Sequence, residues 1–216
     1  VLLAGFYLMY RSKSGADVTF YSYTIFFAAS MWLLSALVYA MIREFPGETS
    51  GGKNGWKEAM ERMNIVRSDT NFRTFIIARS LLLCSALTAP FYVLLALDIL
   101  GKEGYLLGLF ILVNGLASIL SAPIWGRMAD VSSKNVVVTS AVIASALGIV
   151  MFGLVTYVPI LKHATWLYPL AFFLLGIAHS GVRLGRKTYI VDMASGNRRT
   201  DYVSVSNTII GFILLI

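Results

Sequence analysis

Charged residues are scarce in this chain, which argues against a soluble domain. Only 13% of its 216 residues are Asp, Glu, Lys or Arg, whereas soluble domains usually carry about 25%. Hydrophobic residues make up 57% of the sequence. They are grouped in runs of roughly 20 residues with almost no charge, the length needed to cross a bilayer core of about 30 Å. The runs have no period of two, so they predict an all-α bundle of membrane-spanning helices rather than a barrel.

Cysteine is almost absent, and so are the patterns of enzyme chemistry. Cys84 is the only cysteine, which excludes a disulfide within the chain and a cysteine-based metal site. The sequence has no His-Glu-x-x-His and no Gly-x-Ser-x-Gly motif. Ser180 beside His179 is no catalytic pair, because adjacent helical positions point in different directions. We therefore expect no enzyme activity, no cofactor and no metal site.

The net charge of +7 does not indicate nucleic-acid binding. No nucleic-acid-binding module is recognisable. The Lys and Arg residues, apart from Arg79, lie in the gaps between the apolar runs. The lipid bilayer is the expected partner, and no nucleic acid is expected. The sequence predicts no particular oligomeric state.

Five complete spans are predicted along the chain. They cover residues 20–42, 75–97, 105–125, 136–156 and about 166–183. Both chain ends fall inside apolar runs and the first residue is not Met, so we expect a fragment of a longer protein. Residues 56–67, in the linker after the first span, have one apolar and one charged face. This pattern is typical of a helix on the membrane surface, and equally of a solvated linker helix.

The distribution of basic residues predicts which loops are cytoplasmic. Because consecutive spans cross in opposite directions, the loops between them fall into two alternating sets. One set, residues 43–73, 126–135 and 183–201, holds 13 of the 18 Lys and Arg residues, and the other set holds four. Cytoplasmic loops are enriched in Lys and Arg. We therefore expect an integral protein of the plasma (inner) membrane with the linker 43–73 in the cytoplasm.

The segment 126–135 reads Gly-Arg-Met-Ala-Asp-Val-Ser-Ser-Lys-Asn. It resembles the short cytoplasmic loop of the major facilitator superfamily (MFS), whose pattern is Gly-x-x-x-Asp-Arg/Lys-x-Gly-Arg/Lys-Arg/Lys. Three positions match the pattern: Gly126, Asp130 and Lys134. Three depart from it: Val131, Ser133 and Asn135. A partial match of this kind is typical of the second copy of the loop, between helices 8 and 9 of the family.

The resemblance covers essentially the whole chain and implies an order of parts. Residues 1–42 would be the end of the first bundle (helices 5 and 6), 43–73 the cytoplasmic linker, and 74–216 the second bundle from helix 7 to the start of helix 11. It implies a secondary active transporter that moves a small solute by alternating access, with H⁺ or Na⁺ as a coupling ion. The alternative is a non-transporting receptor or scaffold on the same fold.

The resemblance also implies a gating loop. We expect Gly126 to allow close helix approach. Asp130 should lie near the start of the next helix, where its charge suits the helix dipole, and should pair with an arginine of a neighbouring helix. The alternative is a tight polar turn without a gating role.

A second match to the family follows the fifth span, in the region from helix 10 into helix 11. Arg183 and Arg186 lie there, and the acidic Asp192 precedes Arg198 and Arg199. The resemblance implies that these arginines form the cytoplasmic gate with Asp130. The resemblance implies a pair between Asp192 and one of the last two arginines. Ordinary juxtamembrane charge is the alternative.

Three polar residues inside the spans are candidates for contact with solute or proton. Ionisable groups inside a membrane are costly and often functional. Arg79 could bind an anion or carboxylate in a central cavity, or extend to the interface. His179 could relay a proton, or simply hydrogen-bond a neighbouring helix. Asn114, with Ser118 one turn on, most simply serves hydrogen bonding between helices.

Overall fold

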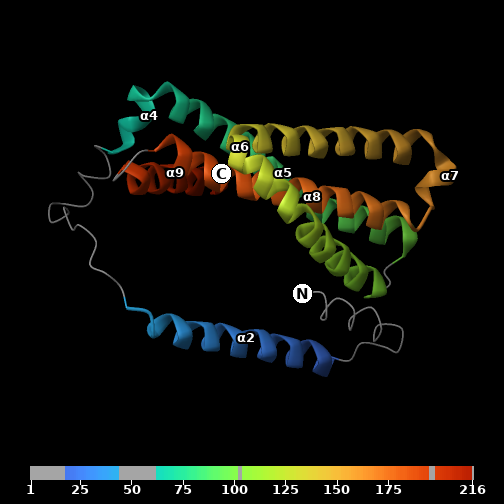
Figure 1. Ribbon diagram of the computed structural model, residues 1–216. Coiled ribbons are helices and arrows are strands. Elements are labelled where there is room, and N and C mark those ends of the chain that lie inside the picture. Colours follow the sequence, from blue (N-terminus) through green and yellow to red (C-terminus); the bar gives the residue numbers. More distant parts are fainter. Residues whose placement is uncertain (1–17, 44–61, 102–103, 195–197, 216) are drawn as a thin grey trace.

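The computed structural model describes residues 18–43, 62–101, 104–194 and 198–215. Within these ranges the chain is helical and has no strand, which confirms the predicted all-α fold. The helices are α2 (Val18–Ala40), α4 (Ile65–Ser68), α5 (Thr70–Leu100), α6 (Gly104–Tyr157), α7 (Pro159–Lys162), α8 (Leu167–Met193) and α9 (Arg198–Leu214), as shown in Figure 1.

Helix α6 is long enough to cross the membrane twice. Four stretches of the described residues are long and apolar enough to span, and one of them, Tyr105–Tyr157, has 53 residues. At 1.5 Å per residue it would be about 80 Å long, far more than a core of about 30 Å. The backbone of Ser132 leaves the helical region, with φ −162° and ψ 105°, and Figure 1 shows the two parts of α6 meeting at a sharp angle. With α6 counted as two, the described residues hold five candidate passes.

Side-chain caps and a glycine set the helix ends. The Oδ1 atom of Asp69 accepts from the backbone N–H groups of Asn71 at 2.9 Å and Phe72 at 3.1 Å, which starts α5. Ser132 starts the second part of α6 in the same way, since its Oγ accepts from the backbone N–H of Asn135 at 3.3 Å. Helix α5 is followed by Gly101, whose φ of 99° is readily adopted only by glycine.

Two apolar clusters lie at opposite ends of the bundle. One joins the start of α5 to the end of α8 and the start of α9; its buried members are Phe72, Phe75, Ile76, Ile190, Ala194, Tyr202 and Val205. The other joins the end of α5, both outer ends of α6 and the start of α8; its buried members are Ala96, Leu106, Phe110, Leu147, Met151, Leu167, Tyr168, Ala171 and Leu175. Helix α2 lies apart from these helices in Figure 1, and its Trp32 is 81% exposed.

Three glycines let α8 pack tightly against both parts of α6. A Cβ on Gly176 would lie 2.9 Å from Ala117 Cβ, and one on Gly185 would lie 2.8 Å from Val137 Cγ2. A Cβ on Gly181 would meet both parts at once, at 2.7 Å from Trp125 Cε2 and 2.8 Å from Ser140 Cβ. At Gly181 and Gly185, as at Gly176, the lack of a side chain is therefore what permits the close contact.

Several predicted helix ends are wrong. The turn expected at 126–135 is helical up to Ser132, and the fifth span continues beyond residue 183 to Met193. Helix α5 likewise extends to Leu100, beyond the predicted end of the second span at residue 97. The physical reason is that hydropathy marks where the membrane ends, whereas a helix can continue into the polar interface. Residues 1–17, and 56–61 of the expected surface helix, lie outside the described residues.

Candidate gating and solute sites

Arg79 connects α5 to α9 inside the bundle. Its Nη1 donates to the Oγ of Ser206, and its Nη2 donates to the Oδ1 of Asn207 at 2.9 Å. Both acceptors are neutral. The Nε of Arg79 is buried and has no hydrogen-bond partner. Arg186 of α8 is close enough to repel the Arg79 guanidinium electrostatically. The structure thus brings two predicted site residues together, although the sequence assigned them to different sites.

His179 lies between α8 and α5. Its Nε2 is 3.5 Å from the Oγ1 of Thr88, and both side chains are half-buried. Which of the two atoms donates depends on the histidine tautomer. The contact places an imidazole, which can carry a proton, between two spans. It also fits the simpler interpretation, a hydrogen bond between helices.

Asn114 and Ser118 lie where the first part of α6 meets α8. Ser180 donates to the Oγ of Ser118 at 3.3 Å, so a hydrogen bond between the two helices is present at Ser118. The Oδ1 of Asn114 lies against Gly176, at 2.9 Å from where a Cβ would stand. Nearby, Trp125 Nε1 donates to the carbonyl of Ile177 at 2.9 Å. These contacts hold α6 and α8 together through groups that are also polar enough to contact a solute.

The loop residues are arranged differently from the prediction. No other helix approaches Gly126 closely, because a Cβ there would meet nothing within 4 Å. The expected close approach at this glycine is absent. Asp130 precedes the break at Ser132, so it lies at the C-terminal end of a helical segment, where a negative charge is unfavourable; the predicted N-terminal placement is wrong. Asp130 and Lys134 are both exposed. It is Ser133 that makes the contact between helices, by donating to the Oδ2 of Asp192 at 2.5 Å.

The predicted arginine partners point elsewhere. The Nη2 of Arg183 donates to Ser180 Oγ at 3.3 Å, and the Nε of Arg199 donates to the carbonyl of Ala194 at 3.2 Å. Within the described residues, neither Asp130 nor Asp192 forms an ion pair with these two arginines. Arg198 begins α9, and its side chain lies outside the described residues.

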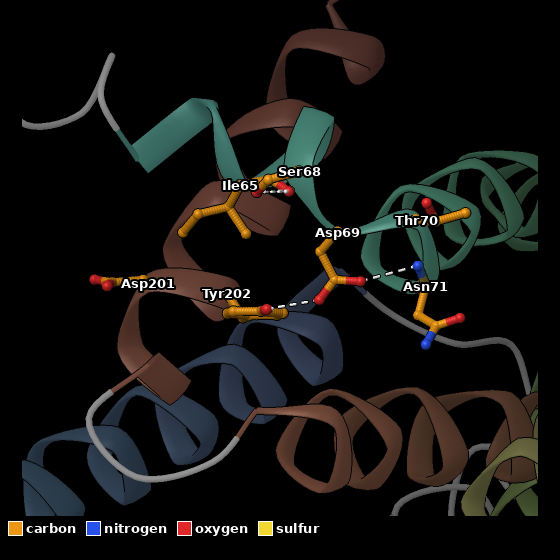
Figure 2. A pocket seen from close by; sticks show the side chains of 7 residues that line it. All are labelled: Ile65, Ser68, Asp69, Thr70, Asn71, Asp201 and Tyr202. Carbon is orange, nitrogen blue, oxygen red and sulfur yellow. Dashed lines mark hydrogen bonds between the residues drawn. The ribbon is translucent and has the colours of Figure 1, made fainter.

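Sequence reasoning missed a polar junction between α4, α5 and α9. The hydroxyl of Tyr202 donates to Oδ2 of Asp69 at 2.7 Å, while Oδ1 of the same carboxylate caps α5. Figure 2 shows Asp69 between Asn71 and Tyr202, at the edge of a pocket of about 580 Å³. Arg62 forms an ion pair with Asp201 at 2.7 Å. An aspartate just before an apolar run is a helix-start signal, so Asp69 could have been found, but Tyr202 could not.

These contacts gather the three basic segments at one end of the bundle. Ser133 in 126–135 bonds Asp192 in 183–201. Asp69 in 43–73 bonds Tyr202, which directly follows 183–201. The loops that the charge count groups together are therefore neighbours in space. Among the described residues, no cluster of three or more His, Cys, Asp or Glu side chains could hold a metal ion.

Comparison with known families identifies the fold. A family model described as the Major Facilitator Superfamily matches residues 2–216. Comparisons with curated proteins and with solved structures gave no match. The family match extends over the spans, the broken α6 and the polar sites between α5, α8 and α9. The chain therefore belongs to the Major Facilitator Superfamily, whose members are integral membrane transporters of small solutes.

Proposed function

We propose that the chain belongs to a secondary active transporter that moves its solute by alternating access, driven by a gradient of H⁺ or Na⁺. The observation that best supports this is the placement of Arg79, which is held by Ser206 and Asn207 inside an apolar bundle. A charge at such a depth is costly, and a solute site would account for it.

The proposed organisation follows the expected order of parts. Residues 1–42 end the first bundle, 43–73 form the cytoplasmic linker, and 74–216 form the second bundle. The separation of α2 from the other helices in Figure 1 supports this division. The gathering of the basic segments at one end supports a cytoplasmic location for the linker in a plasma (inner) membrane protein.

The polar contacts suggest a division of roles. The cytoplasmic gate would use the exposed Asp130 and Lys134 at the break in α6, together with the bond from Ser133 to Asp192. Arg198 and Arg199 at the start of α9 would complete the charge around it. His179 would carry the coupling proton, since its contact with Thr88 would change on protonation.

Counterflow in liposomes tests the proposal. The full protein is reconstituted, loaded with an unlabelled solute, and given a trace of the same solute labelled outside, across a panel of small anions, cations and neutral compounds. A carrier that alternates between two states exchanges the two pools, so label should accumulate transiently with at least one solute. An imposed pH or Na⁺ gradient should then drive net uptake. Empty liposomes are the control. Binding of a solute without any counterflow would contradict the proposal and favour a receptor.

A further inference from the structure

Arg79 and Arg186 lie at a similar depth in the bundle. Counting from the start of α5 at Thr70, Arg79 is about 14 Å inside at 1.5 Å per residue. Counting back from the end of α8 at Met193, Arg186 is about 10 Å inside on the same scale. The rings of Phe75 and Tyr189, about one turn from Arg79 and Arg186 respectively, have centroids 5.5 Å apart. The two cations thus lie at one level, within the part of the bundle that faces the basic loops.

No described carboxylate is available to compensate this pair. Three of the acidic groups at this end of the bundle are already engaged. Asp69 accepts from Tyr202 and caps α5, Asp192 accepts from Ser133, and Asp201 pairs with Arg62. Asp130 is exposed at the break in α6, and Asp98 lies near the opposite end of α5.

The Arg79 side chain is held in place, but not all of its hydrogen-bond donors have a partner. Ser206, which is fully buried, and Asn207 accept from the two terminal nitrogens. The printed bonds use two of the five N–H donors of the guanidinium, and the Nε has no partner, so donors of the fork remain unused. Arginine binds carboxylate and phosphate groups through adjacent donors of this fork. Both arginine side chains are half-buried, so part of each remains exposed at the surface of the described helices.

We infer that Arg79 and Arg186 together bind an oxyanion group, a carboxylate or a phosphate, of the transported solute. This rests on the proposed transporter function and adds the substrate class to it. The anion would satisfy Nε and offset the repulsion between the arginines, which no described side chain does. Ser206 and Asn207 act as positioning residues, because they orient the guanidinium.

Ligand-induced stabilisation of the purified full protein tests the site. Thermal unfolding in detergent is measured with inorganic phosphate, succinate or chloride at matched ionic strength. A ligand that binds the folded state raises Tm, so phosphate or succinate should raise it by several degrees more than chloride does. Arg79→Gln and Arg186→Gln should each abolish the difference. The matched controls Arg73→Gln on α5 and Lys187→Gln on α8, both exposed, should keep it.

The remaining outcomes separate the sources of the anion and the two proposals. Equal Tm values in all three salts, or an undiminished shift in Arg186→Gln, would overturn the anion site. If added phosphatidylglycerol raised Tm while phosphate and succinate did not, the site would bind a lipid headgroup and the proposal would also be overturned. If Arg79→Gln does not fold, Arg186→Gln still decides. Counterflow restricted to neutral or cationic solutes would reject the anion site and leave the transporter. Stabilisation by phosphate or succinate without any counterflow would keep the anion site and reject the transporter function.

Discussion

Ser133 donates a hydrogen bond to Asp192, and this bond ties the break in α6 to the last turn of α8. Ser133 is buried, with 4% of its surface exposed. In the loop pattern that residues 126–135 resemble, this position is glycine, which has no hydroxyl to donate. A departure from the pattern therefore supplies a contact between two spans that the matching residues do not make.

Removing the Ser133 hydroxyl should loosen this junction. Ser133→Ala leaves the Asp192 carboxylate without its donor, and a hydrogen bond to a charged group contributes about 1.5–3 kcal/mol when buried. Because Asp192 is exposed, we expect a loss nearer 1 kcal/mol, measured as a lower Tm in detergent. Ser204→Ala is the control, since that exposed serine bonds only the Asp201 carbonyl of its own helix. Equal Tm values for the two variants would show that the bond contributes nothing to stability.

Asp130→Asn should show whether the Asp130 carboxylate serves transport or stability. At the C-terminal end of the first part of α6, the negative charge opposes the helix dipole, so its removal should leave Tm unchanged or slightly raised. Uptake should nevertheless slow, because the proposed gate would lose its exposed carboxylate. Membrane insertion and Tm are measured beside the initial uptake rate. Uptake equal to that of the wild type would exclude Asp130 from the gate.

Tyr202→Phe should weaken the attachment of α9 to α5. The variant keeps the ring, which packs on Phe72 with centroids 4.6 Å apart, and removes only the hydroxyl that binds Asp69. We expect a loss of about 1 kcal/mol and faster amide hydrogen exchange at the start of α9. Tyr157→Phe is the matched control, because Tyr157 is 74% exposed. Unchanged exchange in α9 would mean that packing alone holds the junction.

Gly181→Ala should disrupt the packing of α8 between the two parts of α6. The new methyl group would meet the Trp125 ring and Ser140 at under 3 Å, and such overpacking typically costs about 1–3 kcal/mol. Gly148→Ala is the control: a Cβ there meets nothing within 4 Å, and alanine favours the helix by up to about 1 kcal/mol. Tm should therefore fall in the first variant and rise or stay constant in the second. A Tm for Gly181→Ala at or above the wild-type value would refute the tight contact.

The spans and the grouping of the basic loops could be predicted because both depend on local sequence. A run of apolar residues must be buried in lipid whatever its neighbours are, and charge asymmetry is read loop by loop. The break at Ser132 was predicted only approximately, since the polar residues before it remain helical. Nothing in the hydropathy of residues 126–131 distinguishes a turn from a helix that projects beyond the membrane.

The contacts between helices could not be predicted, because they join residues far apart in the sequence. Arg79 was a candidate as a charge inside a span, but its acceptors lie 127 and 128 positions later. Arg186 was assigned to the gate by the family resemblance, whereas its position on α8 brings it near Arg79. Tyr202 has no sequence signal, since an isolated tyrosine near a membrane interface is common.

Labelling from each side of the membrane should test the two passes of α6 and the orientation together. In a background in which Cys84 and any cysteine outside these 216 residues are replaced by serine, single cysteines replace Lys134 and His163, both exposed and separated by one pass. A membrane-impermeant maleimide should label Lys134→Cys only in inside-out vesicles and His163→Cys only in right-side-out vesicles, while the cysteine-free background alone stays unlabelled. The opposite pattern would keep the two passes and reverse the orientation. Labelling of both positions from the same side would mean that the second part of α6 does not cross the membrane.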